Sequence, residues 1–103
     1  MVKSFEAAAK IVKSTLSGEY PQIRRAWIFG SFSDDSQSDQ SDLDIMVEMD
    51  TAMGLEFISM IQDLEEATNI RVDVITIDQA HDLEEKYGYV ITRKAVPIYE
   101  RTA

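Results

Sequence analysis

The chain has no cysteine, two prolines and four glycines, and its basic residues are few: ten, against nineteen acidic ones. The absence of cysteine excludes disulfide bonds and thiolate zinc sites, and it fits a reducing compartment. No apolar run approaches the roughly 20 residues that a membrane span requires, so we expect no membrane segment. Lys10 and Lys13 interrupt the first residues, which therefore lack the continuous apolar core of a signal peptide. Together these absences predict a cytoplasmic protein.

The surplus of acidic residues gives a formal net charge of -9 at pH 7. Such a surface repels polyanions, so direct binding of nucleic acid is a poor hypothesis, whereas a basic protein surface would be attracted. Acidity also serves plain solubility, and composition leaves both explanations open. The 103 residues predict one domain, 1–103, with a real core but little room to grip two substrates. We therefore expect a partner or a second copy.

Apolar periodicity predicts alternating helices and strands. The expected elements are a helix between Ser4 and Gly18, strands over 26–29 and 43–48, a helix over 55–67, a strand over 71–77, a helix that begins at Asp78, and a strand over 96–99. The polar segment 31–41 favours a hairpin of the first two strands, and Pro97 suits an edge strand. This order predicts an α/β fold with a small mixed four-stranded sheet flanked by helices.

Two short motifs carry the chemistry. One apolar run ends in Gly30-Ser31, and ten residues later a second run opens with Asp42-Leu43-Asp44. Side chains alternate along a strand, so Asp42 and Asp44 project to one side while Leu43 points to the other. Two neighbouring carboxylates repel each other, and a divalent cation removes that cost. Glycine permits a close approach of the backbone, and Ser31 offers an N–H and a hydroxyl to phosphate oxygens. The pairing predicts a site that handles nucleotides.

This pattern resembles the signature of the nucleotidyltransferase superfamily, specifically its minimal nucleotidyltransferase (MNT) branch, which includes MNT antitoxins. The resemblance extends to the length, to a carboxylate on a later strand and to the terminal segment 93–100. It implies the nucleotidyltransferase fold, with a short helix after Gly30-Ser31 whose N-terminus faces a triphosphate. It also implies two Mg²⁺ ions.

The later carboxylate is Asp73, which lies in the middle of a predicted strand. Aspartate has poor β-propensity, so a charge there needs a reason, although an exposed strand face is the simple alternative. In a two-metal arrangement Asp42, Asp44 and Asp73 would be the catalytic residues and metal ligands. Gly30 and Ser31 would bind the nucleotide.

The resemblance implies an enzyme that transfers AMP from ATP, or from another nucleoside triphosphate, to a hydroxyl. The implied acceptor is a tyrosine on a helical HEPN-family ribonuclease toxin, which makes a hetero-oligomer the expected assembly. Two alternatives stay open: an antitoxin that neutralises its partner by binding alone, and the nucleotidyl-transfer subunit of a small-molecule-modifying enzyme.

The chain departs from the family after Gly30-Ser31. Many relatives continue with Arg-Ala-Arg-Gly, whereas this chain has Phe32-Ser33-Asp34-Asp35. The missing arginines leave fewer cations for a triphosphate. Lysine or arginine from elsewhere in the chain, or from a partner, would have to compensate.

Overall fold

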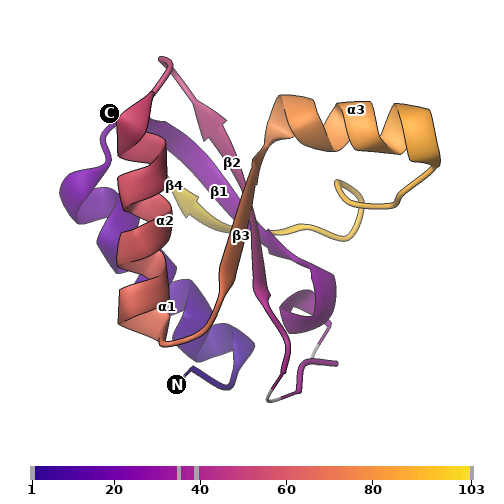
Figure 1. Ribbon diagram of the computed structural model, residues 1–103, viewed down its shortest axis with the longest axis horizontal. Coiled ribbons are helices and arrows are strands. Elements are labelled where there is room, and N and C mark those ends of the chain that lie inside the picture. Colours follow the sequence, from indigo (N-terminus) through magenta and orange to yellow (C-terminus); the bar gives the residue numbers. More distant parts are fainter. Residues whose placement is uncertain (1, 35, 39, 103) are drawn as a thin grey trace.

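A single four-stranded sheet organises the molecule. The computed structural model describes residues 2–34, 36–38 and 40–102. The elements along the chain are α1 (Phe5–Glu19), β1 (Ile23–Phe29), the 3-10 helix η1 (Gly30–Ser33), β2 (Leu43–Met49), α2 (Leu55–Thr68), β3 (Val72–Thr76), α3 (Ile77–Tyr87) and β4 (Val96–Glu100). Helices α1 and α2 cover one face of the sheet, and α3 lies on the other side (Figure 1). The predicted α/β fold is confirmed. None of the described helices is both long enough and apolar enough to cross a membrane.

The strands lie in the order β3-β2-β1-β4, and the sheet is mixed. β1 pairs antiparallel with β2, as the polar segment between them predicted, and also with β4. β2 pairs parallel with β3, because α2 carries the chain back across one face of the sheet before β3 begins. β4 is an edge strand, which confirms the prediction from Pro97.

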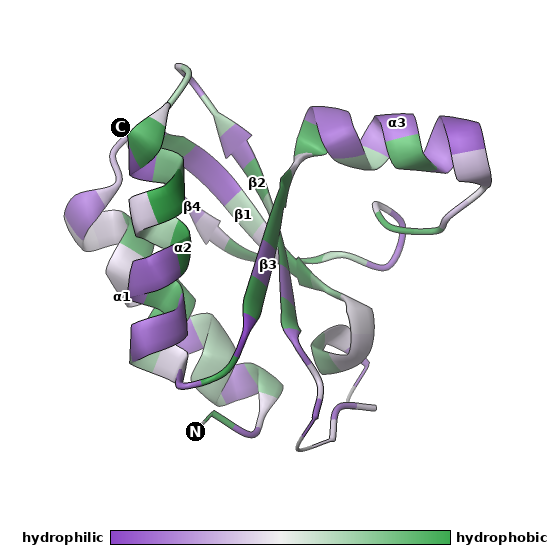
Figure 2. Ribbon diagram, viewed as in Figure 1, coloured by the Kyte–Doolittle hydropathy of each residue, from purple (hydrophilic) through white to green (hydrophobic). Residues whose placement is uncertain are grey.

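Strand alternation separates the two faces of β2. Leu43, Ile45 and Val47 are fully buried in the main core with α1 and α2. Met46 faces the other way and packs in a smaller apolar cluster with Ala80 of α3 and Ile91. Figure 2 shows β3 as largely hydrophobic and α3 as largely hydrophilic, which fits a strand that packs against α2 and α3 and a helix that lies on the surface. Asp44 therefore projects toward the α3 side of the sheet.

The first helix begins as predicted and ends slightly later. Ser4 caps it, since its hydroxyl accepts the N–H of Ala7 at 3.1 Å. Gly18 does not end the helix, which continues to Glu19, so that prediction was wrong by one residue. The residue before a proline disfavours the helical conformation, and the helix stops where Pro21 imposes this limit on Tyr20.

The predicted start of α3 was also wrong. Asp78 lies inside the helix, and Thr76 is the cap: its hydroxyl accepts the N–H of Gln79, whose side chain accepts the N–H of Thr76 in return. Strand β3 therefore passes into α3 without a loop. Gly88, with φ +71°, ends the helix. This junction fixes α3 close to the end of β3.

A buried tyrosine ties the end of α1 to α2. Tyr20 is 5% exposed, and its hydroxyl donates to Oδ2 of Asp63. Burial, followed by this bond and the Asp63 charge, raises the pKa of Tyr20. Tyr20→Phe should lower the free energy of unfolding by about 1–2 kcal/mol, because Asp63 loses its donor. Urea denaturation measures this difference. Tyr87→Phe, at an exposed position, is the matched control and should change stability by less than about 0.5 kcal/mol.

Candidate active site

Two carboxylates meet where β1 ends and where β2 and β3 begin. Asp44 lies opposite Phe29 in the antiparallel pair and beside Asp73 in the parallel pair. Directly paired residues share a face of the sheet, so these three side chains form one row on the α3 side. The adjacent row on that face is apolar and consists of Trp27, Met46 and Ile75. The carboxylates therefore stand at the rim of an apolar surface.

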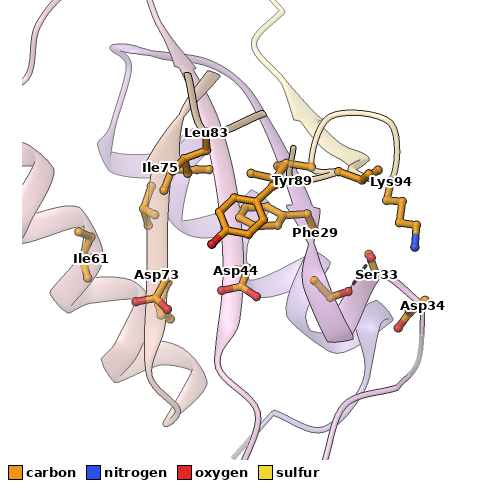
Figure 3. Close-up of a pocket in the computed structure, with 15 residues that line it drawn as sticks. Phe29, Ser33, Asp34, Asp44, Ile61, Asp73, Ile75, Leu83, Tyr89 and Lys94 are labelled. Carbon is orange, nitrogen blue, oxygen red and sulfur yellow. Dashed lines mark hydrogen bonds between the residues drawn. The ribbon is translucent and has the colours of Figure 1, made fainter. Parts of the chain in front are cut away.

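A cavity of about 880 Å³ opens over this row. Its lining residues are Phe29, Gly30, Ser33, Asp34, Asp44, Ile61, Val72, Asp73, Val74, Ile75, Leu83, Tyr89, Val90, Ile91 and Lys94. Figure 3 shows Asp44 and Asp73 side by side at its base, with the ring of Tyr89 lying across it. The volume is in the range of small-molecule sites, and an apolar lining with a few polar groups is their usual composition.

The carboxylates repel one another. Burial raises the pKa of Asp44 to about 6, and the charges of Asp73 and Asp42 add to the effect. Asp44 is half-buried, whereas Asp73 is exposed. A cation between such groups would remove the repulsion and favour the charged form of Asp44. The site is therefore suited to a positively charged ligand.

The carboxylate of Asp44 lies against the backbone at Gly30. A Cβ atom at this position would lie 2.2 Å from Oδ2 of Asp44, and the φ of +72° is one that side chains rarely adopt. Only glycine lets this carboxylate lie against the backbone of η1. Asp44 thus makes a close approach to Gly30 within the chain itself. The role of Gly30 in nucleotide binding stays a prediction.

Ser31 and Ser33 occupy different places on η1. Ser33 lines the cavity, and its hydroxyl donates to the carbonyl of Gly30 at 2.7 Å (Figure 3). Ser31 is half-buried and is absent from the cavity lining, while its carbonyl accepts the N–H of Ser36 at 3.0 Å. The role of Ser31 in nucleotide binding stays a prediction.

Asp42 precedes β2 and is half-buried. Its charge reaches Asp44, but Asp42 does not line the cavity. Within residues 2–34, 36–38 and 40–102, no three acidic, histidine or cysteine side chains are grouped as a metal site. The oxygens of Asp44 and Asp73 are nevertheless the hard ligands that Mg²⁺ prefers. The metal roles of Asp42, Asp44 and Asp73 stay predictions.

The segment between α3 and β4 supplies residues that sequence reasoning missed, Tyr89 and Lys94. Glu84 of α3 holds this segment, since its Oε2 accepts the N–H groups of Ile91 and Thr92, both at 2.9 Å. These bonds hold the pKa of Glu84 below its usual value. Tyr89 belongs to no motif, and the resemblance over 93–100 gave Lys94 no role in the site, so the approach of these residues to the cavity could not be read from the sequence.

Of the residues after Ser31 that differ from the family pattern, Phe32 lies in the core and Asp34 lines the cavity. Phe32 is 2% exposed and packs in the main core. Asp34 is exposed and lines the cavity. Asp35 lies outside the described residues. The aromatic residue at 32 therefore has a packing role, and position 34 contributes a negative charge to the cavity.

Comparisons with known proteins place this geometry in a family. Residues 10–103 match the family model described as Polymerase beta, Nucleotidyltransferase. Two relatives from Methanocaldococcus jannaschii bear the name protein adenylyltransferase. One is 37% identical over 62 residues, which cover 59% of this chain and 67% of the relative. The other is 40% identical over 65 residues, which cover 62% of this chain and 74% of the relative.

Solved structures of toxin-antitoxin complexes contain a similar fold. A chain from a toxin-antitoxin complex with AMP-PNP has a TM-score of 0.72 at 21% identity, over 91% of this chain and 74% of that one. A chain from the complex of a tri-AMPylated Shewanella oneidensis HEPN toxin with its MNT antitoxin has a TM-score of 0.68 at 18% identity, over 94% and 73%. At this level of identity the likeness concerns the fold. The fold, the motif residues and the family match agree, and the chain belongs to the polymerase beta-type nucleotidyltransferase family.

Proposed function

We propose that this protein transfers AMP from ATP to a hydroxyl of a helical HEPN-type partner and so acts as an antitoxin. One observation carries the proposal: Asp44 and Asp73 stand together beside Gly30 at the base of a cavity of nucleotide size. Relatives named protein adenylyltransferase, and neighbours from complexes with AMP-PNP and with an AMPylated HEPN toxin, support this choice of reaction.

The reaction is a displacement at the α-phosphorus of ATP. The acceptor hydroxyl oxygen forms a bond to that phosphorus, the bond to the oxygen bridging toward the β-phosphate breaks, and pyrophosphate leaves. The hydroxyl proton passes to solvent. We assign two Mg²⁺ ions to Asp44 and Asp73, with Asp42, which precedes β2, as a further ligand. Magnesium would neutralise phosphate charge and make the acceptor hydroxyl more acidic.

Residues in the cavity, and Ser31 next to it, would orient the nucleotide. Gly30 has no side chain, so the backbone of η1 can lie close to Asp44. Ser31 would donate to phosphate oxygens from the same turn. The apolar part of the cavity suits a nucleobase, and the ring of Tyr89 offers a surface for stacking. Placing the base there leaves the α-phosphate near Asp44 and Asp73.

The charge of the protein suits a protein acceptor. The net charge of -9 attracts a basic partner over distance and raises association rates at low salt. A cytoplasmic location, where ATP and a ribonuclease toxin would both be present, belongs to the same proposal.

Labelled ATP tests the function directly. The protein is incubated with Mg²⁺ and a HEPN-type protein that it binds, with ATP labelled on either the α- or the γ-phosphate. Nucleotidyl transfer should place label on the partner from α-labelled ATP alone, and mass spectrometry should find added AMP on a partner tyrosine. Label from γ-labelled ATP would instead indicate phosphoryl transfer and contradict the proposal.

A second candidate is an antitoxin that acts by contact without catalysis. It is favoured by one observation: Asp34 lines the cavity together with Asp44 and Asp73, which leaves the cavity acidic. If Asp44→Asn silences the partner as well as the wild type does, and neither protein gains AMP, the contact mechanism is correct. Label that appears only on added small molecules would favour a small-molecule-modifying subunit.

A further inference from the structure

The cavity contains one positive charge among several negative ones. Of the described residues that line it, Lys94 alone is basic, whereas Asp34, Asp44 and Asp73 are acidic. A nucleoside triphosphate carries several negative charges, and carboxylates by themselves would repel it. A cation on the wall of such a cavity would offset this repulsion and so favour the binding of phosphate groups.

Lys94 is placed by the fold at the end of η1. It belongs to the turn before β4, where its N–H donates to the carbonyl of Ile91 at 3.3 Å. Glu84 fixes that turn to α3 through its bonds to the segment. Figure 3 shows the Lys94 side chain extending toward Ser33 and Asp34, away from Asp73. The ammonium group thus stands on the wall of the cavity that η1 forms.

The positive charge of Lys94 affects the pKa of Asp34. Hydrogen bonds from Ser36 are the main cause that lowers the pKa of Asp34, and the Lys94 charge lowers it further. None of the residues of η1 is basic, and Asp34, which follows η1, adds a negative charge to the cavity. Lys94 therefore brings a cation from a distant segment to the place where η1 lacks one.

We propose that Lys94 binds the β- and γ-phosphates of the nucleoside triphosphate, an inference that rests on the proposed function. With the α-phosphate near Asp44 and Asp73, the rest of the triphosphate extends along η1 past Ser33 to the ammonium group. An ammonium group acts as a point charge toward phosphate and stabilises the negative charge that gathers on departing pyrophosphate. Lys94 thus supplies the positive charge that η1 lacks. The carboxylate of Asp34 competes with the phosphates for it.

Binding measurements separate this inference from the function itself. Calorimetry with Mg²⁺ compares AMP-PNP and AMP on the wild type, Lys94→Met and Lys94→Arg. Lys94→Met should weaken the binding of AMP-PNP by about tenfold and leave the binding of AMP unchanged, because only AMP-PNP has phosphates that reach Lys94. Lys94→Arg should retain most of the affinity. Asp34→Asn should strengthen AMP-PNP binding, since it removes the competing anion.

Lys86→Met, on the exposed last turn of α3 and outside the cavity lining, is the matched control and should bind both ligands as the wild type does. Equal AMP-PNP affinity in Lys94→Met and the wild type would overturn the inference while leaving the proposed function intact. An equal loss of AMP binding would also overturn it, because Lys94 would then act on the whole site. A wild type that binds AMP-PNP no better than AMP would overturn the inference too, since no contact to the β- and γ-phosphates would exist. Failure of transfer with normal AMP-PNP binding would count against the function alone.

Discussion

Replacing Asp44 by asparagine should abolish AMP transfer while the protein stays folded. The amide keeps the shape of the side chain but loses the charge that would hold Mg²⁺ beside Asp73, so the rate should fall by about a hundredfold or more. Transfer of label from α-labelled ATP to the partner measures this rate. Asp82→Asn, the same substitution on the exposed surface of α3, should leave it unchanged. An Asp44→Asn rate within tenfold of the wild type would rule out the mechanism.

The same variant should be more stable than the wild type at neutral pH when metal is absent. The pKa of Asp44 rises from 3.8 to about 6 on folding, because burial and then Asp73 and Asp42 disfavour its charged form. The folded state therefore binds more protons between these values, and stability falls as the pH rises through this window. Asparagine removes that loss. Above pH 6 the free energy of unfolding of Asp44→Asn should exceed that of the wild type by about 1 kcal/mol, a value reduced to allow for solvent screening. Below pH 4 the two proteins should be equally stable.

Urea denaturation in EDTA at several pH values measures the difference between the two proteins. Adding Mg²⁺ should stabilise the wild type more than the variant, because only the wild type keeps both carboxylates. A difference that is the same at pH 4 and pH 7 would show that repulsion at Asp44 is not its cause.

Replacing Gly30 by alanine should have the second largest effect. The new Cβ would meet Oδ2 of Asp44 at 2.2 Å, so the carboxylate must move away from its place beside Asp73. The φ of +72° adds backbone strain of about 1 kcal/mol. We expect a loss of transfer approaching that of Asp44→Asn, together with a modest loss of stability. Ser31→Ala should be milder, because it removes one hydroxyl and leaves the backbone N–H in place.

Gly54 provides the control for backbone strain. Its φ is +58°, and a Cβ there would meet nothing within 4 Å. Gly54→Ala should therefore lower stability without lowering transfer, as measured by thermal unfolding and by label on the partner. If Gly30→Ala and Gly54→Ala lose stability and activity in the same proportion, the clash with Asp44 has no special role.

The local features of the fold were predictable because they depend on neighbours in the chain. Alternation of Leu43, Ile45 and Val47 set the buried face of β2 and thereby turned Asp44 toward the opposite face. The hairpin of β1 and β2, the cap at Ser4 and the edge position of Pro97 follow from short-range rules. The helix ends were less predictable, because the capping box at Thr76 and the limit set by Pro21 compete with simpler signals at Asp78 and Gly18.

The sequence by itself determined the elements of the fold and the two motifs that place Gly30 and Asp44 close together. The tertiary structure decided the rest of the site. Asp73 reaches Asp44 only through the parallel register of β2 and β3, which the crossover through α2 sets, and a shift of one residue would turn Asp73 to the other face. Lys94 comes from a segment far along the chain and is held by its bonds to α3. Such contacts depend on how packed elements meet, and local residue patterns do not encode them.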